Sequence, residues 1–382
     1  MSPKTGKFSS FEEGVMQDLL DRAGLQKGNT SPNPVTAAAI VRDEKVVAIG
    51  VHERAGKPHA EVEAIRQAGD LCEGADLYVN LEPCTHHGRT GPCTEAIVAA
   101  GIKRVIFAVS DPNPEVRKNP AGPILAASGI AVQEGLLADQ AMCLNEVFFK
   151  NVVAQLPFVT LKVGMSLDGR IAMSSGESKY ITGEASRQRV HEMRHQADAL
   201  IVGVDTILAD DPRLNVRFEN REVAGRDPVA VILDVSGKTP GSARVFDALP
   251  DGNVVIVTGP DVALEKVSEW PSHVTVLALP VKNGHFDWKA LLKVLYARGL
   301  GHIILEGGSG VYSSALASGV VDKLAVFIAP LIIGEAKAKP WVALSSVTRL
   351  DEALKIADMT GDRCGNDLVI SGYLQHPKQW FG

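Results

Sequence analysis

The hydrophobic and polar positions of the first 150 residues follow helical and strand spacing in turn. Two apolar runs, Thr36–Arg42 and Lys45–His52, flank an Asp43-Glu44 pair, which predicts a hairpin. The other predicted elements are helices at Phe11–Lys27, Ala60–Ala68 and Thr94–Ala100, and strands at Asp76–Leu81 and Arg104–Val109. Helices and strands in this order predict an α/β domain.

A second series of elements begins near residue 155, after the segment Asn151–Pro157, which we interpret as a linker. The predicted strands are Phe158–Val163, Ala199–Val202, Val229–Leu233, Val254–Val257, Val274–Ala278, His302–Leu305 and Leu324–Ile328. The predicted helices are Glu184–Gln196, Trp288–Arg298 and Val311–Ser318. The pattern therefore predicts two α/β domains, at residues 1–150 and 155–382.

Composition narrows the classes of function. Aromatic residues make up 5% of the chain and the net charge is -6, which argues against a nucleic-acid partner. No apolar run reaches about 18 residues, so we expect no membrane span. The N-terminal residues lack the apolar core of a secretory signal, so we expect a cytoplasmic protein. We also expect small-molecule substrates and a homo-oligomer whose size the sequence leaves open.

Five cysteines in an unexported chain suit metal binding or catalysis better than disulfides. Two of them, Cys84 and Cys93, each follow a proline, and His59 precedes both. A catalytic zinc ion usually has three protein ligands and an open position for water. His59, Cys84 and Cys93 meet that requirement, so we predict one zinc ion per chain.

Glu61 stands two residues after the histidine, where zinc deaminases have a glutamate that shuttles protons without binding the metal. Zinc lowers the pKa of its bound water, which makes a nucleophile available near neutral pH. Cys93 is expected at a helix start, which favours a thiolate. The remaining cysteines, Cys72, Cys143 and Cys364, have no partner motif, and we assign them no role.

The motifs PHAEVEAI, LEPCTHHGRTGPC and DPNPEV resemble the deaminase domain of the bifunctional riboflavin-biosynthesis deaminase/reductase family. The eight-residue spacing between the two cysteines is longer than the C-x-x-C of nucleoside deaminases. The resemblance implies a cytidine-deaminase-like α/β/α fold and a phosphorylated diaminopyrimidinone as substrate. It places substrate contacts at Asn33, His52, His86, Arg89, Asp111 and Asn113, with Arg89 at the 5′-phosphate. The alternative for Asp111 and Asn113 is a simple turn, which this composition also favours.

Two segments near these residues depart from the family pattern. They are residues 34–39, PVTAAA, and residues 117–123, RKNPAGP. Both departures bear on substrate binding and leave the metal ligands unchanged.

The second domain has no G-x-G-x-x-G that opens a βαβ unit, so a Rossmann dinucleotide site is not supported. The turn Leu305–Gly310 lies between a predicted strand and helix, where backbone N–H groups can meet a phosphate. An ordinary tight connection would look the same. Asp210-Asp211-Pro212 also favours a turn and is not specific by itself.

The motifs LKVGMSLDGRIA, GESKYIT, ADALIVGVDTILADDPRLNVR, ILEGGSG and VVDKLAVFIAPLIIG resemble the reductase domain of the same family. This resemblance implies a dihydrofolate-reductase-like α/β fold and hydride transfer from NADPH. Substrate contacts then fall on Lys162, Ser178, Arg194, Asp210, Leu214, Arg217 and Glu306. Cofactor contacts fall on Gly203, Thr206, Asp210, Gly307, Gly308, Ser309 and Gly310.

We therefore predict a zinc-dependent deaminase joined to an NADPH-dependent reductase. It would deaminate 2,5-diamino-6-ribosylamino-4(3H)-pyrimidinone 5′-phosphate and then reduce the ribosyl group of the product to ribityl. Arg217 and Arg194 would anchor the phosphate in the reductase, and either Asp210 or Lys162 would supply the proton. Two alternatives stay open: a nucleotide or nucleic-acid deaminase with an unrelated second domain, and a half-active relative that keeps one domain for assembly.

Overall fold

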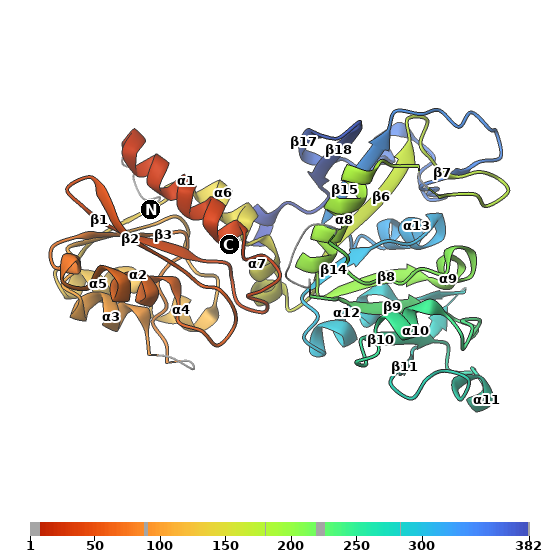
Figure 1. The fold of residues 1–382 in the computed structure, drawn as a ribbon, viewed down its shortest axis with the longest axis horizontal. Coiled ribbons are helices and arrows are strands. Elements are labelled where there is room, and N and C mark those ends of the chain that lie inside the picture. Colours follow the sequence, from red (N-terminus) through yellow and green to blue (C-terminus); the bar gives the residue numbers. More distant parts are fainter. Residues whose placement is uncertain (1–7, 88–90, 180, 219–225, 283, 381–382) are drawn as a thin grey trace. The chain divides into compact units, whose positions relative to one another are not determined.

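The computed structural model describes residues 8–87, 91–179, 181–218, 226–282 and 284–380. The chain divides into two compact units, Met1–Gln155 with Pro377–Gly382, and Leu156–His376. In Figure 1 each unit is a sheet with helices on both faces. The predicted class, two α/β domains, is confirmed.

The first unit is built on a five-stranded sheet in the order β2-β1-β3-β4-β5. Strand β1 is antiparallel to β2 and β3, whereas β3, β4 and β5 are parallel. The strands are β1 (Ala37–Arg42), β2 (Lys45–Val51), β3 (Asp76–Val79), β4 (Arg104–Phe107) and β5 (Ala131–Glu134). The helices are α1 (Ser10–Gly24), α2 (Ala60–Ala68), η1 (Gly69–Cys72), α3 (Cys93–Ala99), α4 (Pro114–Lys118), α5 (Ala121–Ala127), α6 (Ala138–Leu144), α7 (Glu146–Ala154) and η3 (Pro377–Trp380).

Successive side chains point to opposite faces of this sheet, and each face packs in a separate apolar core. Ala37 and Ala39 of β1 pack with α1 and Phe149 of α7. Ala38 and Ile40 pack on the other face with α2, α3 and α5. The predicted hairpin is confirmed as β1 and β2. Asp43 and Glu44 both take positive φ angles, 51° and 54°, as a two-residue hairpin turn requires.

The second unit is built on a nine-stranded sheet in the order β11-β10-β9-β8-β14-β6-β15-β18-β17. Its strands are β6 (Phe158–Ser166), β8 (Ala199–Gly203), β9 (Val229–Leu233), β10 (Val254–Thr258), β11 (Thr275–Ala278), β14 (His302–Leu305), β15 (Lys323–Ala329), β17 (Ala357–Cys364) and β18 (Asp367–Tyr373), with short pairs β7 (Arg170–Ala172) and β16 (Lys339–Pro340), and β12 (Val281–Lys282) and β13 (His285–Phe286). The helices are α8 (Glu184–Gln196), α9 (Val204–Asp210), α10 (Arg244–Ala248), α11 (Leu264–Val267), α12 (Trp288–Ala297), α13 (Ser309–Ala317) and η2 (Leu350–Glu352).

The strands from β11 to β15 run parallel, and β18 and β17 add an antiparallel edge. Helices α12 and α13 cover one face of the sheet (Figure 1). The other face packs against α10 and the Ile207 side chain of α9. Among the described residues, no helix has both the length and the apolar character needed to cross a membrane.

Two expectations about the borders of the domains differ from the structure. The segment Asn151–Pro157 is not a linker along its whole length, because α7 continues to Ala154. Four residues near the C-terminus, Pro377–Trp380, belong to the first unit, although we expected the second domain to include them. There, Lys378 Nζ pairs with Asp139 of α6 at 2.8 Å, and Lys150 Nζ of α7 lies 5.7 Å from the centre of the Trp380 ring.

These contacts predict that the C-terminal turn stabilises α6 and α7. Trp380→Ala should lower the free energy of unfolding of the first unit by about 1–3 kcal/mol, because partly buried aromatic area and a cation–π contact are lost. Hydrogen exchange in the full chain should show faster exchange in α6 and α7. Trp341→Ala, which removes a partly buried tryptophan of the second unit, is the matched control. Unchanged exchange in α6 and α7 of Trp380→Ala would contradict the assignment.

Candidate active sites

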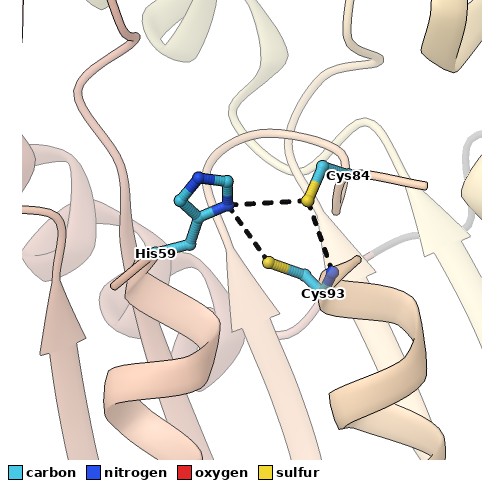
Figure 2. Close-up of side chains that lie close together, drawn as sticks. All are labelled: His59, Cys84 and Cys93. Atoms are coloured by element: carbon cyan, nitrogen blue, oxygen red, sulfur yellow. Dashed lines mark hydrogen bonds between the residues drawn. The ribbon is translucent and has the colours of Figure 1, made fainter. Parts of the chain in front are cut away.

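Three metal-binding side chains converge at the starts of two helices in the first unit (Figure 2). His59 immediately precedes α2, Cys93 is the first residue of α3, and Cys84 lies in the loop after β3. The Nδ1 atom of His59 is 3.3 Å from Sγ of Cys93 and 3.5 Å from Sγ of Cys84. The three donor atoms lie within 4.8 Å of one another. The structure thus brings together all three predicted zinc ligands.

The spacing of these donors fits zinc. Zinc–nitrogen bonds of about 2.0 Å and zinc–sulfur bonds of about 2.3 Å at tetrahedral angles separate the two donor types by roughly 3.5 Å. The backbone N–H of Cys93 also donates to Sγ of Cys84 at 3.3 Å, which stabilises a thiolate there. One histidine and two cysteines leave the fourth tetrahedral position for water or substrate, as a catalytic site needs.

The two thiols change one another's acidity. The Cys93 thiol beside Cys84 lowers the pKa of Cys84 to about 4. The same contact, together with burial, raises the pKa of Cys93. Because a zinc ion binds thiolates, binding displaces the proton that remains on this pair. Metal affinity at this site should therefore increase with pH.

Glu61, the predicted proton shuttle, lies in the first turn of α2 and its residue is 4% exposed. Burial raises the pKa of its carboxyl group, and the negative charge of Cys84 raises it further. An interaction with the Cys93 thiol places this carboxyl group beside the metal ligands. A carboxyl group whose pKa is raised toward the working pH can both accept and donate a proton.

A cavity of about 360 Å³ includes His59, Glu61 and Cys84 in its wall. This volume suits a small molecule. Five predicted substrate contacts also line the cavity: Asn33, His52, His86, Asp111 and Asn113. The sixth, Arg89, lies outside the described residues. The other lining residues, to which sequence reasoning gave no individual role, include Thr36, Lys57, Glu82 and Phe148.

His52 orients the side chain of Asn33. Its Nδ1 atom lies 2.9 Å from the carbonyl oxygen of Pro58, which can only accept, so Nδ1 carries the proton. Its Nε2 atom therefore accepts from Nδ2 of Asn33 at 3.1 Å. Burial lowers the pKa of His52, which favours this neutral ring. The Asn33 nitrogen is consequently directed at His52, and its carboxamide oxygen remains as an acceptor.

Glu82 holds the loop that carries Asp111 and Asn113. Its carboxylate accepts from the backbone N–H groups of Asp111, at 3.0 Å, and of Ala121, at 2.8 Å. Asp111 accepts from the N–H of Asn113, and Asn113 caps α4, so the turn is real and its side chains also line the cavity. Burial raises the pKa of Asp111 to about 7, and the charge of Glu82 contributes. Glu82 adjoins the Pro83-Cys84 pair, the sequence signal that could have found it.

The two segments that depart from the family pattern touch this site through main-chain groups. The carbonyl oxygen of Thr36 accepts from the N–H of His52 at 2.9 Å. The N–H of Ala121 donates to Glu82. Backbone carbonyls are common to all residues, and N–H groups to all except proline, so these contacts tolerate the altered side chains.

In the second unit, three predicted contacts form one buried ion network. Glu306 follows β14, and its carboxylate pairs with Arg194 of α8 through Nε at 2.8 Å and Nη2 at 2.9 Å. Lys162 Nζ of β6 lies 3.3 Å from the same carboxylate. Despite burial, the charges of Arg194 and Lys162 hold the pKa of Glu306 well below its usual range. Arg194 is therefore already paired with a carboxylate, so it is less available than Arg217 to bind the substrate phosphate.

Arg217 lies in a cationic group after α9. Burial lowers the pKa of Arg217, and the positive charges of Arg194, Arg213 and Arg244 lower it further. Arg194 donates to the carbonyl oxygen of Asn215, and Arg217 contacts the Asn215 side chain. Leu214, at a φ of 55° and 3% exposed, turns the chain into this group. Such concentrated positive charge suits a phosphate.

His191 of α8 adjoins this cationic group and sequence reasoning missed it. Its Nδ1 atom accepts from the N–H of Arg217 at 3.2 Å. Burial, followed by the charges of Arg194 and Arg217, lowers the pKa of His191 to about 4. A separate pair joins Ser178 and Asp210, where the serine hydroxyl donates at 3.2 Å.

The predicted cofactor residues follow two neighbouring parallel strands, β8 and β14. Gly307 and Gly308 precede α13, whose first residues have no side-chain cap, so its N–H groups can meet a phosphate. A Cβ at Gly307 would lie 2.7 Å from Val311 Cβ, so the close turn requires glycine. These features fit a dinucleotide phosphate.

The other predicted cofactor residues lie at the starts or ends of helices. Thr206 and Asp210 belong to helix α9, which begins directly after Gly203. Ser309 and Gly310 are the first two residues of α13. Helix α13 therefore starts two residues earlier than the predicted Val311, directly after Gly308.

Comparison with known proteins finds a matching family for each domain. The cytidine and deoxycytidylate deaminase zinc-binding region matches residues 9–109, and the RibD C-terminal domain matches residues 157–370. The riboflavin biosynthesis protein RibD of Aquifex aeolicus is 40% identical over 360 residues, 94% of this chain and 98% of the relative. The solved structure of Acinetobacter baumannii RibD has a TM-score of 0.83 at 34% identity, covering 95% of this chain and 98% of that one.

A diaminohydroxyphosphoribosylaminopyrimidine deaminase/5-amino-6-(5-phosphoribosylamino)uracil reductase from Thermotoga maritima also matches, with a TM-score of 0.82 at 34% identity, covering 95% of this chain and 98% of that one. Fold and sites together define a zinc-binding deaminase joined to a reductase. The chain belongs to the RibD family of riboflavin biosynthesis proteins. Its first domain is a zinc-dependent deaminase and its second domain is an NADPH-dependent reductase.

The donor geometry predicts one zinc ion per chain. Cys84→Ala should lose the metal, because two ligands bind zinc far more weakly than three, and should destabilise the first unit, because metal binding is coupled to folding. The measurement is the zinc content of each variant, produced with adequate zinc. Cys364→Ala, on the edge strand β17, should keep one zinc ion and is the control. Zinc retained at full occupancy in Cys84→Ala would contradict the ligand assignment.

Proposed function

We propose that the first domain deaminates 2,5-diamino-6-ribosylamino-4(3H)-pyrimidinone 5′-phosphate by hydrolysis. We propose that the second domain then reduces the ribosyl group of 5-amino-6-(5-phosphoribosylamino)uracil to ribityl. The observation that carries this proposal is the buried Glu61 beside the His59, Cys84 and Cys93 triad, at a cavity whose wall includes Glu61, His59 and Cys84. The name of the Thermotoga maritima relative supports these two substrates.

Glu61 carries the proton transfers of deamination. Zinc, when bound, acts as a Lewis acid that makes water a nucleophile near neutral pH. Glu61 accepts a proton from the attacking water and delivers it to the amino nitrogen, which leaves as ammonia. The remaining proton of the water moves to the adjacent ring nitrogen as the ring carbon becomes a carbonyl. The raised pKa of Glu61 favours the transfer to the amino nitrogen, because the protonated form is then available near neutral pH.

The cavity residues orient the ring. Asn33 presents an oxygen to an N–H group of the pyrimidine, since His52 fixes its nitrogen. Asp111 has a pKa of about 7, so near neutral pH it can either donate to the ring or ribose or accept from them. Lys57 at the cavity wall adds a positive charge suited to a phosphorylated substrate.

In the reductase, NADPH supplies the hydride that adds to C1 of the open-chain ribosylamine. The uncapped start of α13 and the Gly307 turn support cofactor phosphate binding there. Arg217 and its cationic neighbours support the site of the substrate phosphate. Lys162 or Asp210 supplies the proton. Glu306 and Arg194 hold Lys162 in place through the buried ion network.

Reducing conditions suit this chain. None of the five cysteines, all of which lie in the described residues, forms a disulfide, and two of them are the proposed zinc ligands. Thiolate ligands of this kind persist in a reducing compartment, which supports a cytoplasmic protein. Self-association into a homo-oligomer stays a prediction.

Glu61→Gln tests the deaminase assignment. The variant should keep one zinc ion, because Glu61 is not a ligand, and should lose deamination by roughly 10²–10⁴-fold, because glutamine cannot shuttle protons. Reduction of an already deaminated substrate should be normal. Steady-state assays of both reactions with metal analysis provide the measurement. The role of Glu61 fails if deamination proceeds at the wild-type rate.

Arg217→Ala tests the phosphate site of the reductase. Its reductase KM should increase strongly while deamination is unchanged, since a bidentate guanidinium contact to phosphate is lost. Arg217→Lys should recover little of the lost substrate affinity, because an ammonium group cannot make the two parallel hydrogen bonds that a guanidinium group makes to phosphate. Arg189→Ala, which removes an exposed arginine of α8 paired with Glu192, is the control. Normal reductase kinetics in Arg217→Ala would place the phosphate elsewhere.

A further inference from the structure

The segment that enters β1 has its main chain held by distant side chains. Residues 33, 34 and 36 line the deaminase cavity, but the strand begins at Ala37. Val35, at the centre of this segment, is 5% exposed, so its peptide groups need partners within the protein. Those partners come from two asparagines, Asn80 and Asn145.

Asn145 binds both peptide groups of Val35. Its Oδ1 atom accepts from the N–H of Val35 at 2.8 Å, and its Nδ2 atom donates to the carbonyl oxygen of Val35 at 3.0 Å. The Asn145 side chain thus makes the hydrogen bonds that a neighbouring strand would make, although it is 110 residues from Val35 in sequence. Asn145 is 3% exposed and stands at the joint between α6 and α7.

Asn80 completes the arrangement from the other side of the segment. Its Nδ2 atom donates to the same Val35 carbonyl at 3.0 Å, and its Oδ1 atom accepts from the N–H of Ala37 at 2.8 Å. Asn80 adjoins β3 and is fully buried. Asn80 anchors the beginning of the strand, whereas Asn145 reaches the residue nearer to Asn33.

We propose that Asn145 is a positioning residue for deamination, which sets the Asn33 segment against the substrate. The matched region of the deaminase family ends at residue 109, so Asn145 lies beyond it. Phe148, which follows Asn145 by one helical turn on α7, lines the same cavity. One buried amide therefore ties together two parts of the cavity wall, Asn33 with its neighbours and Phe148. The proposal rests on the proposed deamination.

Asn145→Asp is the discriminating variant. It keeps the acceptor for the Val35 N–H but turns a second oxygen toward the Val35 carbonyl, so two acceptors face one another. The segment should shift, and Asn33 should move with it. Deaminase kcat/KM should fall roughly 10- to 100-fold, because small misplacement of substrate-orienting groups is costly. Zinc content and reductase kinetics should match the wild type.

A double-mutant cycle with Asn33→Ala separates positioning from general destabilisation. If Asn145 acts through Asn33, adding Asn145→Asp to Asn33→Ala should change kcat/KM by less than about threefold. Met142→Ala, which removes a buried side chain of α6, controls for loss of stability and should leave the deaminase KM unchanged. If Asn145→Asp does not fold, Asn145→Ser, which keeps a hydroxyl group at the joint, enters the same cycle.

The outcomes distinguish the two proposals. Wild-type kcat/KM in Asn145→Asp, or full additivity with Asn33→Ala, overturns the positioning role and leaves the proposed deamination intact. A wild-type chain that holds zinc but does not deaminate the pyrimidine overturns the proposed function itself. A fall in kcat/KM that disappears in the Asn33→Ala background supports the inference.

Discussion

Parallel strands need crossover connections, so the loops and helix starts that follow them gather at one edge of a sheet. Both sites are built on this constraint. In the first unit Cys84 follows β3 and Asp111 follows β4, which are parallel neighbours. In the second unit Gly203 ends β8 and Glu306 follows β14, again parallel neighbours. The connections therefore bring reactive side chains together although they are distant in sequence.

Loops that carry chemistry have peptide groups that no strand pairs, and buried polar side chains hold them in place. Glu82 does so for the Asp111 loop, and Asn80 and Asn145 do so for the Asn33 segment. In the second unit the Glu306 carboxylate is balanced by Arg194 and Lys162. Removing either cation would leave a buried charge poorly paired, which is costly. These residues shape the sites through the groups that they hold.

The zinc ligands and the position of Glu61 could be predicted from the sequence because catalytic zinc takes few residue types and zinc deaminases have a recognisable local motif. The central strands of both sheets were predictable from apolar runs that the parallel core requires, such as Val229–Leu233. The largely exposed edge strands β5 and β17, and β18 beside β17, were not predicted. Asn145 and Glu82 were not, since their roles depend on backbone groups brought close by folding. The ion pair of Arg194 was not predictable either, because its partner Glu306 is 112 residues away in sequence. The end of α7 at Ala154 was not predictable because Gln155 takes the left-handed conformation that glycine usually marks in a sequence.

The account depends on two reactions in one chain, with Glu61 serving the first and the cationic Arg217 group serving the second. The most direct test incubates the full chain with the diaminopyrimidinone ribosyl phosphate, with and without NADPH, and analyses product masses. Without NADPH the product should show amino-to-carbonyl exchange alone, and with NADPH it should also gain two hydrogens. A product that gains hydrogens without deamination, or no deamination by zinc-loaded protein, would contradict the account.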